Sequence, residues 1–247
     1  MSWTEKFFGK YYLQTHLPVL TETKTIEETD FIMEALKLDK GAAILDLPCG
    51  HGRHAIKLAQ RGYNVTGMDI QADFITLAKE EAGEQENLSF LSGDMRKISY
   101  DNEFDAVINL FTSFGYFSEQ ENFDLLRSMS KSLKKGGKLL IDTVNREWAM
   151  NNTGTVNQAW LVYPPDNIAF LANNSFNVYT GRMISDQVIV DNGERYEQMQ
   201  DIRLYTYTEI KTLLSFCGME ISASYGNVYQ DEYSAASSNM IIIAEKK

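Results

Sequence analysis

The chain has 247 residues, of which 23 are basic and 34 acidic, so its formal net charge is −11. Its hydrophobic content of 44% is that of a globular protein and excludes a disordered one. The acidic balance argues against nucleic acids or anionic membranes as partners, because clustered Lys and Arg usually neutralise their phosphates. The two cysteines, far apart in sequence, argue against a disulfide framework. No long apolar stretch and no basic leader are present, and we expect a cytoplasmic protein.

The first 40 residues contain two helical patterns. WTEKFFGKYYL (3–13) has helical spacing and many aromatic residues, and ETDFIMEALKL (28–38) carries an apolar stripe. The aromatic side chains either pack in the core or form a lid over a site, and both interpretations stay open. They are Trp3, Phe7, Phe8, Tyr11 and Tyr12.

From residue 43 to residue 145, short apolar runs alternate with helical patterns. Helices of about ten residues between strands imply right-handed crossovers and a parallel sheet covered on both faces. The expected strands lie in AILDL, YNVTGMDI, LSFLSGD, FDAVINLFTSF and KLLIDTVN. The expected helices are RHAIKLAQRG, QADFITLAKEEA and ENFDLLRSMSKSLKKGG, the last of which ends in lysines that offset the helix dipole.

After residue 146 the pattern changes to β-branched and aromatic residues. Asp191-Asn192-Gly193 is a hairpin signal, because Asn and Gly tolerate positive φ. We therefore predict a small antiparallel insertion over residues 150–207. A helix capped by Thr208 and closed by Gly218 should follow, and then MEISASYG and NMIIIAEKK should form an antiparallel strand pair at one end of the main sheet.

The stretch Gly50-His51-Gly52-Arg53-His54-Ala55 fits the nucleotide-binding pattern GxGxxA, and Asp69 ends the following strand. Glycines let backbone N–H groups approach a ligand, and an acid at the next strand end accepts both ribose hydroxyls. This much suits a nicotinamide dinucleotide or S-adenosylmethionine. Asp46 in the turn would oppose a pyrophosphate but suits a cationic ligand. An acid in Gly93-Asp94-Met95 and the terminal strand pair also favour S-adenosylmethionine.

Residues 42–146 resemble the class I S-adenosylmethionine-dependent methyltransferases, and within them the bacterial small-molecule branch with the motif LDxxCGxGRHA. The resemblance implies a Rossmann-like α/β fold, with a seven-stranded, mostly parallel sheet, an antiparallel last strand and helices on both faces. We expect one domain over residues 1–247. In it, 1–40 forms a helical lid, 41–146 the cofactor-binding core, 150–207 an insertion that shapes the acceptor pocket, and 208–247 the final helix and strands.

The same resemblance implies a set of cofactor-binding residues. The loop under the methionine part would contain Asp46, Pro48, Gly50 and Gly52, with Pro48 standing where many relatives have glycine and therefore lacking a donor N–H. Asp69 would bind the ribose. The remaining contacts would be Ile70, Gly93, Asp94 and Met95 around the adenine, and Asn109, Leu110 and Phe111 along the cofactor and facing the acceptor.

Candidates for the acceptor pocket come from three segments. They are Tyr11 and Tyr12 of the lid, Phe114 and Tyr116 after the fourth strand, and Arg203, Tyr205 and Tyr207. The last three alternate along one expected strand face, so they either line the pocket or lie on the surface of the insertion. Methyl transfer from a sulfonium needs alignment but no dedicated nucleophile. A hydroxyl acceptor needs a base, for which His16 and Tyr12 are the candidates.

The cluster Cys49, His51 and His54 has metal-like residue types, but loop residues that flank a glycine turn usually point apart. We expect packing there and no metal. The prediction is therefore a methyltransferase that acts on an N or O atom of a small molecule, as a monomer or homodimer. The alternatives are a sensor that binds the cofactor without transfer, and an NAD(P)-dependent oxidoreductase.

Overall fold

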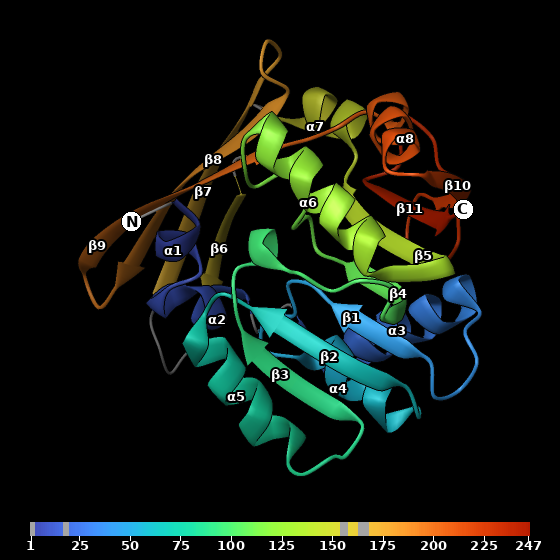
Figure 1. The fold of residues 1–247 in the computed structure, drawn as a ribbon. Coiled ribbons are helices and arrows are strands. Elements are labelled where there is room, and N and C mark those ends of the chain that lie inside the picture. Colours follow the sequence, from blue (N-terminus) through green and yellow to red (C-terminus); the bar gives the residue numbers. More distant parts are fainter. Residues whose placement is uncertain (1–2, 17–19, 154–157, 163–167) are drawn as a thin grey trace.

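The computed structural model describes residues 3–16, 20–153, 158–162 and 168–247. Its larger sheet has the strand order β10-β11-β5-β4-β1-β2-β3 (Figure 1). The strands are β1 Ala43–Asp46, β2 Asn64–Asp69, β3 Leu88–Ser92, β4 Phe104–Asn109, β5 Leu133–Val144, β10 Met219–Tyr225 and β11 Asn239–Lys246. β1 to β5 run parallel, and β11 is antiparallel to both β5 and β10. The predicted seven-stranded sheet with its antiparallel last strand is confirmed.

Helices cover both faces of this sheet, as the alternation of buried side chains requires. Neighbouring strand residues such as Ile44 and Leu45 belong to different hydrophobic clusters. The Ile44 cluster includes side chains of three helices, and the Leu45 cluster includes side chains of three others. The helices are α3 Glu22–Leu36, α4 Arg53–Gln60 and α5 Ala72–Ala82 in the first set, and α6 Glu119–Ser132, α7 Arg146–Asn152 and α8 Tyr207–Phe216 in the second.

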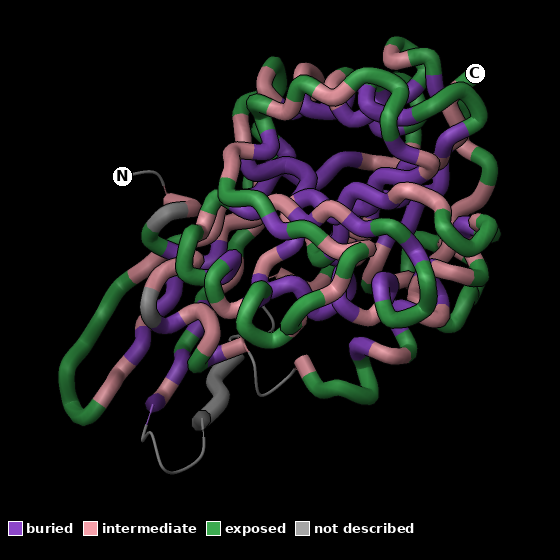
Figure 2. The backbone as a smooth tube through the Cα atoms, turned by 60° about the horizontal axis from the view of Figure 1, so that its bottom comes forward, coloured by how far each residue is buried: buried purple, intermediate pink, exposed green. Residues whose placement is uncertain are grey.

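The insertion forms a separate antiparallel sheet in the order β6-β7-β8-β9. Its strands are β6 Gln158–Val162, β7 Ile168–Asn177, β8 Arg182–Asp191 and β9 Glu194–Arg203. Asn192 (φ 49°) and Gly193 (φ 87°) join β8 to β9, which confirms the predicted hairpin. This turn is the exposed far end of the sheet (Figure 2). A short helix, α7 Arg146–Asn152, connects β5 to the insertion.

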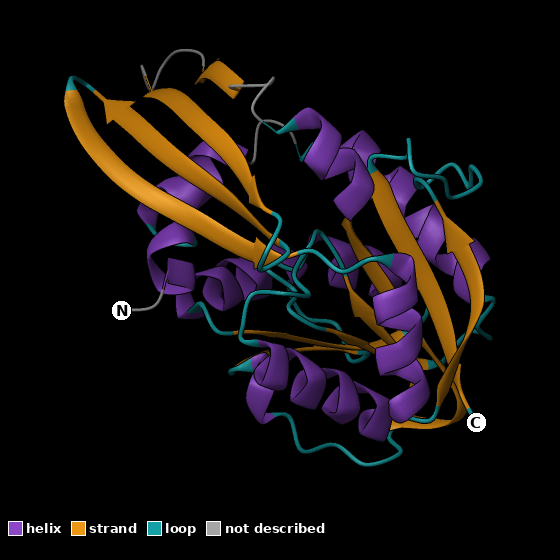
Figure 3. Ribbon diagram, turned by 90° about the horizontal axis from the view of Figure 1, so that it is seen from above, coloured by secondary structure: helices purple, strands orange, loops and turns teal. Residues whose placement is uncertain are grey.

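The N-terminal segment forms two helices, α1 Trp3–Phe7 and α2 Lys10–His16, where the sequence predicted one helix over residues 3–13. The break falls at Phe8 and Gly9, and glycine is a poor helix former. Viewed from above, both helices lie beside the smaller sheet (Figure 3). Consecutive residues of α2 therefore face different neighbours: Tyr11 packs against Tyr196 of β9, and Tyr12 against Phe74 of α5.

Three predicted boundaries are wrong. α3 begins at Glu22 and not at residue 28, because Thr21 caps it by accepting a hydrogen bond from the Lys24 N–H (3.3 Å). α6 ends at Ser132, and the Lys-Lys-Gly-Gly stretch belongs to an irregular start of β5, which pairs with β4 at Leu133 and again from Lys138. Glycine is also a poor helix former. The N-cap of α8 is Thr206 and not Thr208, because the chain leaves β9 at Arg203.

The early end of β9 also corrects the expected strand face. Arg203 is its last residue, Tyr205 lies in the following loop and Tyr207 is the first residue of α8. These side chains therefore do not alternate along one strand. Within the part of the chain that the structure describes, no helix is long and apolar enough to cross a membrane.

Candidate cofactor and active site

A cavity lies at the carboxyl ends of β1 to β4, and residues of the N-terminal segment such as Thr4, Phe8 and Tyr12 line its other side. In parallel α/β sheets, ligands bind at this edge. Most residues that the sequence predicted to bind a cofactor line this cavity. They are Pro48, Gly50, Asp69, Ile70, Gly93, Asp94, Met95, Leu110 and Phe111.

Three of the predicted cofactor residues do not line the cavity but lie behind it: Asp46, Gly52 and Asn109. The Asn109 side chain is fully buried and donates its Nδ2–H to the Leu47 carbonyl (2.7 Å), which holds the loop after β1. Gly52 has φ +82° and precedes α4, where an added Cβ would lie 2.7 Å from the Phe90 ring. Both residues shape the site without facing its contents.

The turn at Gly50 and the carboxylate of Asp69 form one unit. The Gly50 N–H donates to Asp69 Oδ2 (2.8 Å), and the Gln71 N–H donates to Oδ1 (2.9 Å). Burial raises the pKa of Asp69, and the backbone hydrogen bonds, which lower the pKa, offset this effect only in part. Each carboxylate oxygen has further lone pairs, so the group can still accept hydrogen bonds from a pair of ligand hydroxyls. Gly50 has φ +56°, and no atom of the part of the chain that the structure describes lies within 4 Å of where a Cβ would project.

Asp94 follows β3 and caps a short 3-10 turn, Met95–Lys97. Its carboxylate accepts hydrogen bonds from the Arg96 guanidinium (2.8 Å) and the Arg96 N–H (3.0 Å). Burial opposes ionisation here, but these hydrogen bonds outweigh it and lower the pKa of Asp94. The Arg96 guanidinium also lies 4.4 Å from the centroid of the Phe117 ring. The group that the sequence assigned to an adenine amino contact is therefore ionised and fixed in place.

Asp46 is the buried acid of the turn, and only 1% of it is exposed. Within the described part of the chain, its Oδ2 has no hydrogen-bond partner. Burial raises the pKa of Asp46 to about 8, although the Arg53 charge opposes this. The acid is therefore protonated at neutral pH in the free protein. An unpaired buried carboxyl is costly, and a cationic ligand nearby would favour its ionised form.

Arg53 lines the cavity from the start of α4 and is held by α3. Its Nη1 donates to Thr25 Oγ1 (3.1 Å) and to the Glu28 carboxylate, which also accepts the His54 Nε2–H (2.9 Å). Burial opposes the ionisation of Glu28, but His54 and Arg53 outweigh it and lower its pKa to about 2. Burial lowers the pKa of His54 to about 4, so this ring is neutral at pH 7. A cationic guanidinium is thus positioned at the cavity wall.

An aromatic wall closes the other side of the cavity; its rings are those of Phe8, Tyr12, Phe74, Tyr116 and Phe117. Tyr12 lies 4.8 Å from Phe8 and 5.6 Å from Phe74, measured between ring centroids, and Tyr116 lies 5.8 Å from Phe8 and 6.3 Å from Phe117. Burial raises the pKa of Tyr12 to about 12 and that of Tyr116 further. Both phenols are therefore neutral donors at physiological pH.

The candidate base His16 does not line the cavity. Its ring stacks on Tyr12 with centroids 4.3 Å apart, and Nδ1 lies 3.0 Å from the Tyr12 carbonyl and 2.9 Å from Thr15 Oγ1. Burial lowers the pKa of His16. The structure thus places it behind Tyr12 and out of the cavity.

Of the acceptor candidates, only Tyr12 and Tyr116 line the cavity. Tyr11 is buried under the insertion and donates its hydroxyl to Asp191 (3.1 Å). The other candidates lie at a different junction, between the insertion and α6. Phe114 packs on the Tyr205 ring, and the Tyr205 hydroxyl donates to Glu119 (2.9 Å). The Arg203 guanidinium donates to Glu119 (2.5 Å) and to Glu209 (2.7 Å). No described residue of the insertion lines the cavity.

The insertion instead acts on the cavity through the loop after β4. The Arg203 N–H donates to the Gly115 carbonyl (2.9 Å), and an added Cβ at Gly115 (φ +110°) would lie 2.1 Å from the Arg203 carbonyl oxygen. Only glycine permits this approach of two backbones. The contact holds the loop that carries Ser113, Tyr116 and Phe117 to the cavity.

Several lining residues were not among the predicted site residues. Thr4 and Phe8 precede Tyr12 at intervals of four, a spacing that could have identified them. His51, Arg53 and Arg96 lie beside predicted residues. Packing was expected for His51, Arg53 was open between the cofactor's carboxylate and an ion pair, and Arg96 had no expected role. Phe74 carried no distinguishing signal in the sequence. In the described ranges, no three His, Cys, Asp or Glu side chains form a group that could hold a metal ion.

Comparisons with known proteins agree with this geometry. Residues 44–137 match the family described as methyltransferase domain. The chain is 26% identical to YqeM of Bacillus subtilis (strain 168), which bears the name of a methyltransferase, over 95% of this chain and 93% of that one. It is 23% identical to the cypemycin N-terminal methyltransferase of a Streptomyces species, over 84% of each chain.

A solved structure is similar to this chain over nearly its whole length. CalS10 of Micromonospora echinaspora, an amino pentose methyltransferase solved with S-adenosylmethionine bound, superposes with a TM-score of 0.71 at 20% identity, over 97% of this chain and 98% of that one. The fold is that of the class I S-adenosylmethionine-dependent methyltransferases. CalS10 holds S-adenosylmethionine, and a neighbour from Clostridium acetobutylicum is named as dependent on S-adenosylmethionine. The cavity fits it, because a carboxylate, a glycine turn, a guanidinium and an aromatic wall meet there.

Proposed function

We propose that this protein is a methyltransferase that moves the methyl group of S-adenosylmethionine to a nitrogen or oxygen atom of a small molecule. The observation that carries the proposal is the Asp69–Gly50 unit at one side of the cavity, with the aromatic wall at the other. The cofactor requires the first feature and an acceptor requires the second. The enclosed space between them suits a small acceptor and not a folded nucleic acid.

In this proposal the chain's own residues hold the cofactor by its chemical parts. Asp69 accepts the ribose hydroxyls, while Ile70 and Met95 pack on the adenine and Asp94 faces its amino group. Arg53 faces the methionine carboxylate, since a guanidinium pairs with carboxylates more strongly than neutral donors do. Asp46 lies behind the Gly50 turn, where its negative charge favours the cationic sulfonium and ammonium groups.

The proposed roles of the segments follow from what they cover. Residues 1–40 act as a lid, because Thr4, Phe8, Tyr12 and Leu20 line the cavity. Residues 41–146 hold the cofactor, and residues 208–247 complete the sheet. The insertion shapes the acceptor side indirectly, through α1, α2 and Gly115. Closure of such a lid excludes water and aligns the acceptor with the methyl group, which supplies most of the catalysis in an in-line displacement.

Nitrogen is the acceptor atom that the comparisons favour. The cypemycin enzyme is named for an N-terminus and CalS10 for an amino pentose. An aromatic wall with neutral phenols also suits an amine, because π faces attract a cationic ammonium before it loses its proton.

The proposal is tested in two steps. S-adenosylhomocysteine should raise the melting temperature of the protein, and NADH should not, because stabilisation requires binding to the folded state. The protein is then incubated with S-adenosylmethionine and a panel of small amines, phenols and carboxylic acids, and S-adenosylhomocysteine production is measured. Stabilisation by NADH alone would refute the proposal. Binding of S-adenosylhomocysteine without turnover of any acceptor would favour the sensor.

Binding of S-adenosylmethionine is expected to release protons at pH 7. Asp46 is protonated in the free protein, and the cationic cofactor lowers the pKa of this acid, so the proton leaves. Calorimetry in phosphate and in Tris buffer should therefore give different apparent binding enthalpies, and the Asp46→Asn variant should lose most of this difference. Equal proton release by the wild type and Asp46→Asn would contradict the assignment.

A further inference from the structure

His51 lies between Gly50 and Gly52, in the loop that joins β1 to α4, and lines the cavity. Its side chain is mostly enclosed, with 9% of the residue exposed. Within the described part of the chain, neither ring nitrogen makes a hydrogen bond. Burial and the neighbouring Arg53 charge lower the pKa of His51, so the ring is neutral at pH 7. One ring nitrogen of this cavity-lining residue therefore carries a lone pair that no described group occupies.

The other uncharged ionisable groups of the cavity hold their protons at neutral pH. Burial raises the pKa of Tyr12, Tyr116 and Cys49, so each of them is a donor and none is a base. The His54 ring is also neutral, and its Nε2–H donates to the Glu28 carboxylate (2.9 Å). Burial lowers the pKa of His54 to about 4, which makes this ring a weak proton acceptor.

The charged groups that line the cavity also cannot serve as the base, because each has another partner or has no lone pair. Asp94 pairs with Arg96, which makes its carboxylate a poor base. Asp69 accepts backbone hydrogen bonds at both oxygens and is reserved for the ribose. Arg53 and Arg96 are cations and carry no lone pair to accept a proton. By elimination among the described lining residues, His51 is the proton acceptor that remains.

We propose that His51 is a catalytic residue that accepts the proton of the methyl acceptor. The inference rests on the proposed function and extends it. The nucleophilic N or O atom forms a bond to the methyl carbon while the carbon–sulfur bond breaks, and that electron pair stays on sulfur to give the neutral thioether. The acceptor's proton moves to a ring nitrogen of His51 and later to solvent. The sulfonium charge thus becomes an imidazolium charge, so atoms and charges balance.

The test uses sinefungin, an analogue of S-adenosylmethionine that carries an amine at the position of the sulfonium methyl, and compares it with S-adenosylhomocysteine, which has nothing there. The chain has three histidines, and spectra of the His51→Gln variant identify the His51 signals. NMR titration of the imidazoles should show that sinefungin moves the His51 midpoint to lower pH than S-adenosylhomocysteine does, by at least about half a pH unit, because a cation beside the ring opposes its protonation. His54 serves as the internal reference, because Glu28 holds it in both complexes.

Equal midpoints for His51 in the two complexes would overturn the inference, because they place the ring away from the transferred methyl. That result leaves the proposed function intact as long as both compounds bind. Failure of S-adenosylhomocysteine to bind would instead refute the proposed function. With an acceptor from the panel, His51→Gln should lower kcat about 100-fold or more, and Tyr116→Phe less. Equal kcat values for His51→Gln and the wild type would also overturn it.

Discussion

Replacing Asp69 with alanine is expected to weaken S-adenosylhomocysteine binding at least about tenfold, and up to about a hundredfold. The carboxylate has two functions at once, since it orients the Gly50 turn through the Gly50 N–H and accepts the ribose hydroxyls. A hydrogen bond to a charged group contributes about 1.5–3 kcal/mol, and about 1.4 kcal/mol corresponds to a tenfold change in affinity. Isothermal titration calorimetry measures the effect directly.

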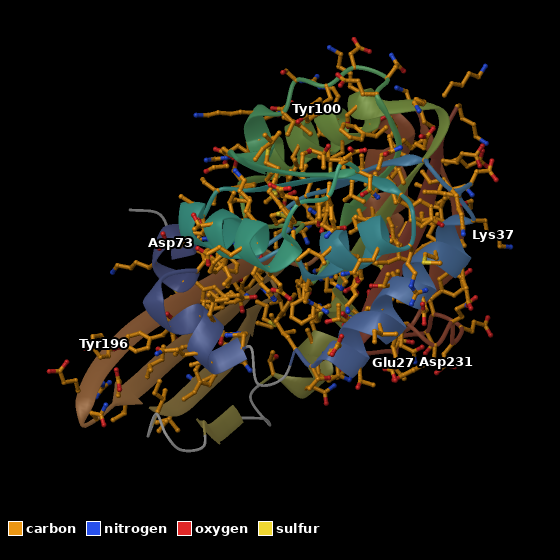
Figure 4. The ribbon with its side chains drawn as sticks, turned by 90° about the horizontal axis from the view of Figure 1, so that it is seen from below. Glu27, Lys37, Asp73, Tyr100, Tyr196 and Asp231 are labelled. Atoms are coloured by element: carbon orange, nitrogen blue, oxygen red, sulfur yellow. The ribbon has the colours of Figure 1, made fainter. Side chains whose placement is uncertain are left out.

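Asp73→Ala is the matched control for this prediction. Asp73 lies four residues further along, exposed in the first turn of α5 (Figure 4), and does not line the cavity. Its replacement should leave the affinity within about twofold, since an exposed helix-terminal charge contributes well under 1 kcal/mol. An Asp69→Ala protein that binds as tightly as the wild type would remove the basis of the cofactor assignment.

Alanine substitutions at the two glycines of the turn are expected to have different effects: Gly52→Ala mainly lowers stability, and Gly50→Ala mainly weakens cofactor binding. Gly52→Ala should lower the free energy of unfolding by about 2–5 kcal/mol, because a left-handed alanine costs about 1–2 kcal/mol and overpacking about 1–3 kcal/mol. The overpacking arises where the new Cβ would lie 2.7 Å from Phe90 and 2.9 Å from the Ala78 Cβ. Urea denaturation measures the loss.

Gly50→Ala is the counterpart on the same loop. Gly50 is also left-handed (φ +56°), but no atom of the described residues lies within 4 Å of an added Cβ, so the cost in stability should stay at about 1–2 kcal/mol. The new methyl group enters the cavity, and S-adenosylhomocysteine affinity should fall more than tenfold by calorimetry, since the cofactor needs that space. If Gly50→Ala proved the less stable variant and bound normally, the two roles would be reversed.

Much of the fold followed from local patterns in the chain. The alternation of apolar runs with helices predicted the parallel strands, and Asn192-Gly193 predicted the hairpin, because these signals depend on near neighbours alone. The helix boundaries were less predictable. Thr206 outcompetes Thr208 as the cap of α8 because the end of β9 sets where the chain turns, and that depends on pairing with β8.

Some of the site residues could likewise be predicted from the sequence, and others could not. The sequence placed Gly50, Asp69 and Asp94 at the cavity, because parallel strands bring their carboxyl ends to one edge wherever the rest of the chain packs. It could not distinguish Tyr11 from Tyr12, which are neighbours in α2. Their roles differ because the insertion lies on one side of that helix and the cavity on the other.

What the sequence by itself determined is therefore the sheet edge, the glycine turn and the carboxylates that follow the strands. Only the tertiary structure decided which side chains complete the site. It buried Arg203 and Tyr205 in an ion-paired junction, tied Arg53 to Glu28 of α3, and left His51 with no hydrogen bond from the described residues. The physical reason is that strand order follows from local hydrophobic periodicity, whereas the partner of a charged or aromatic side chain is set by packing between segments far apart in the chain.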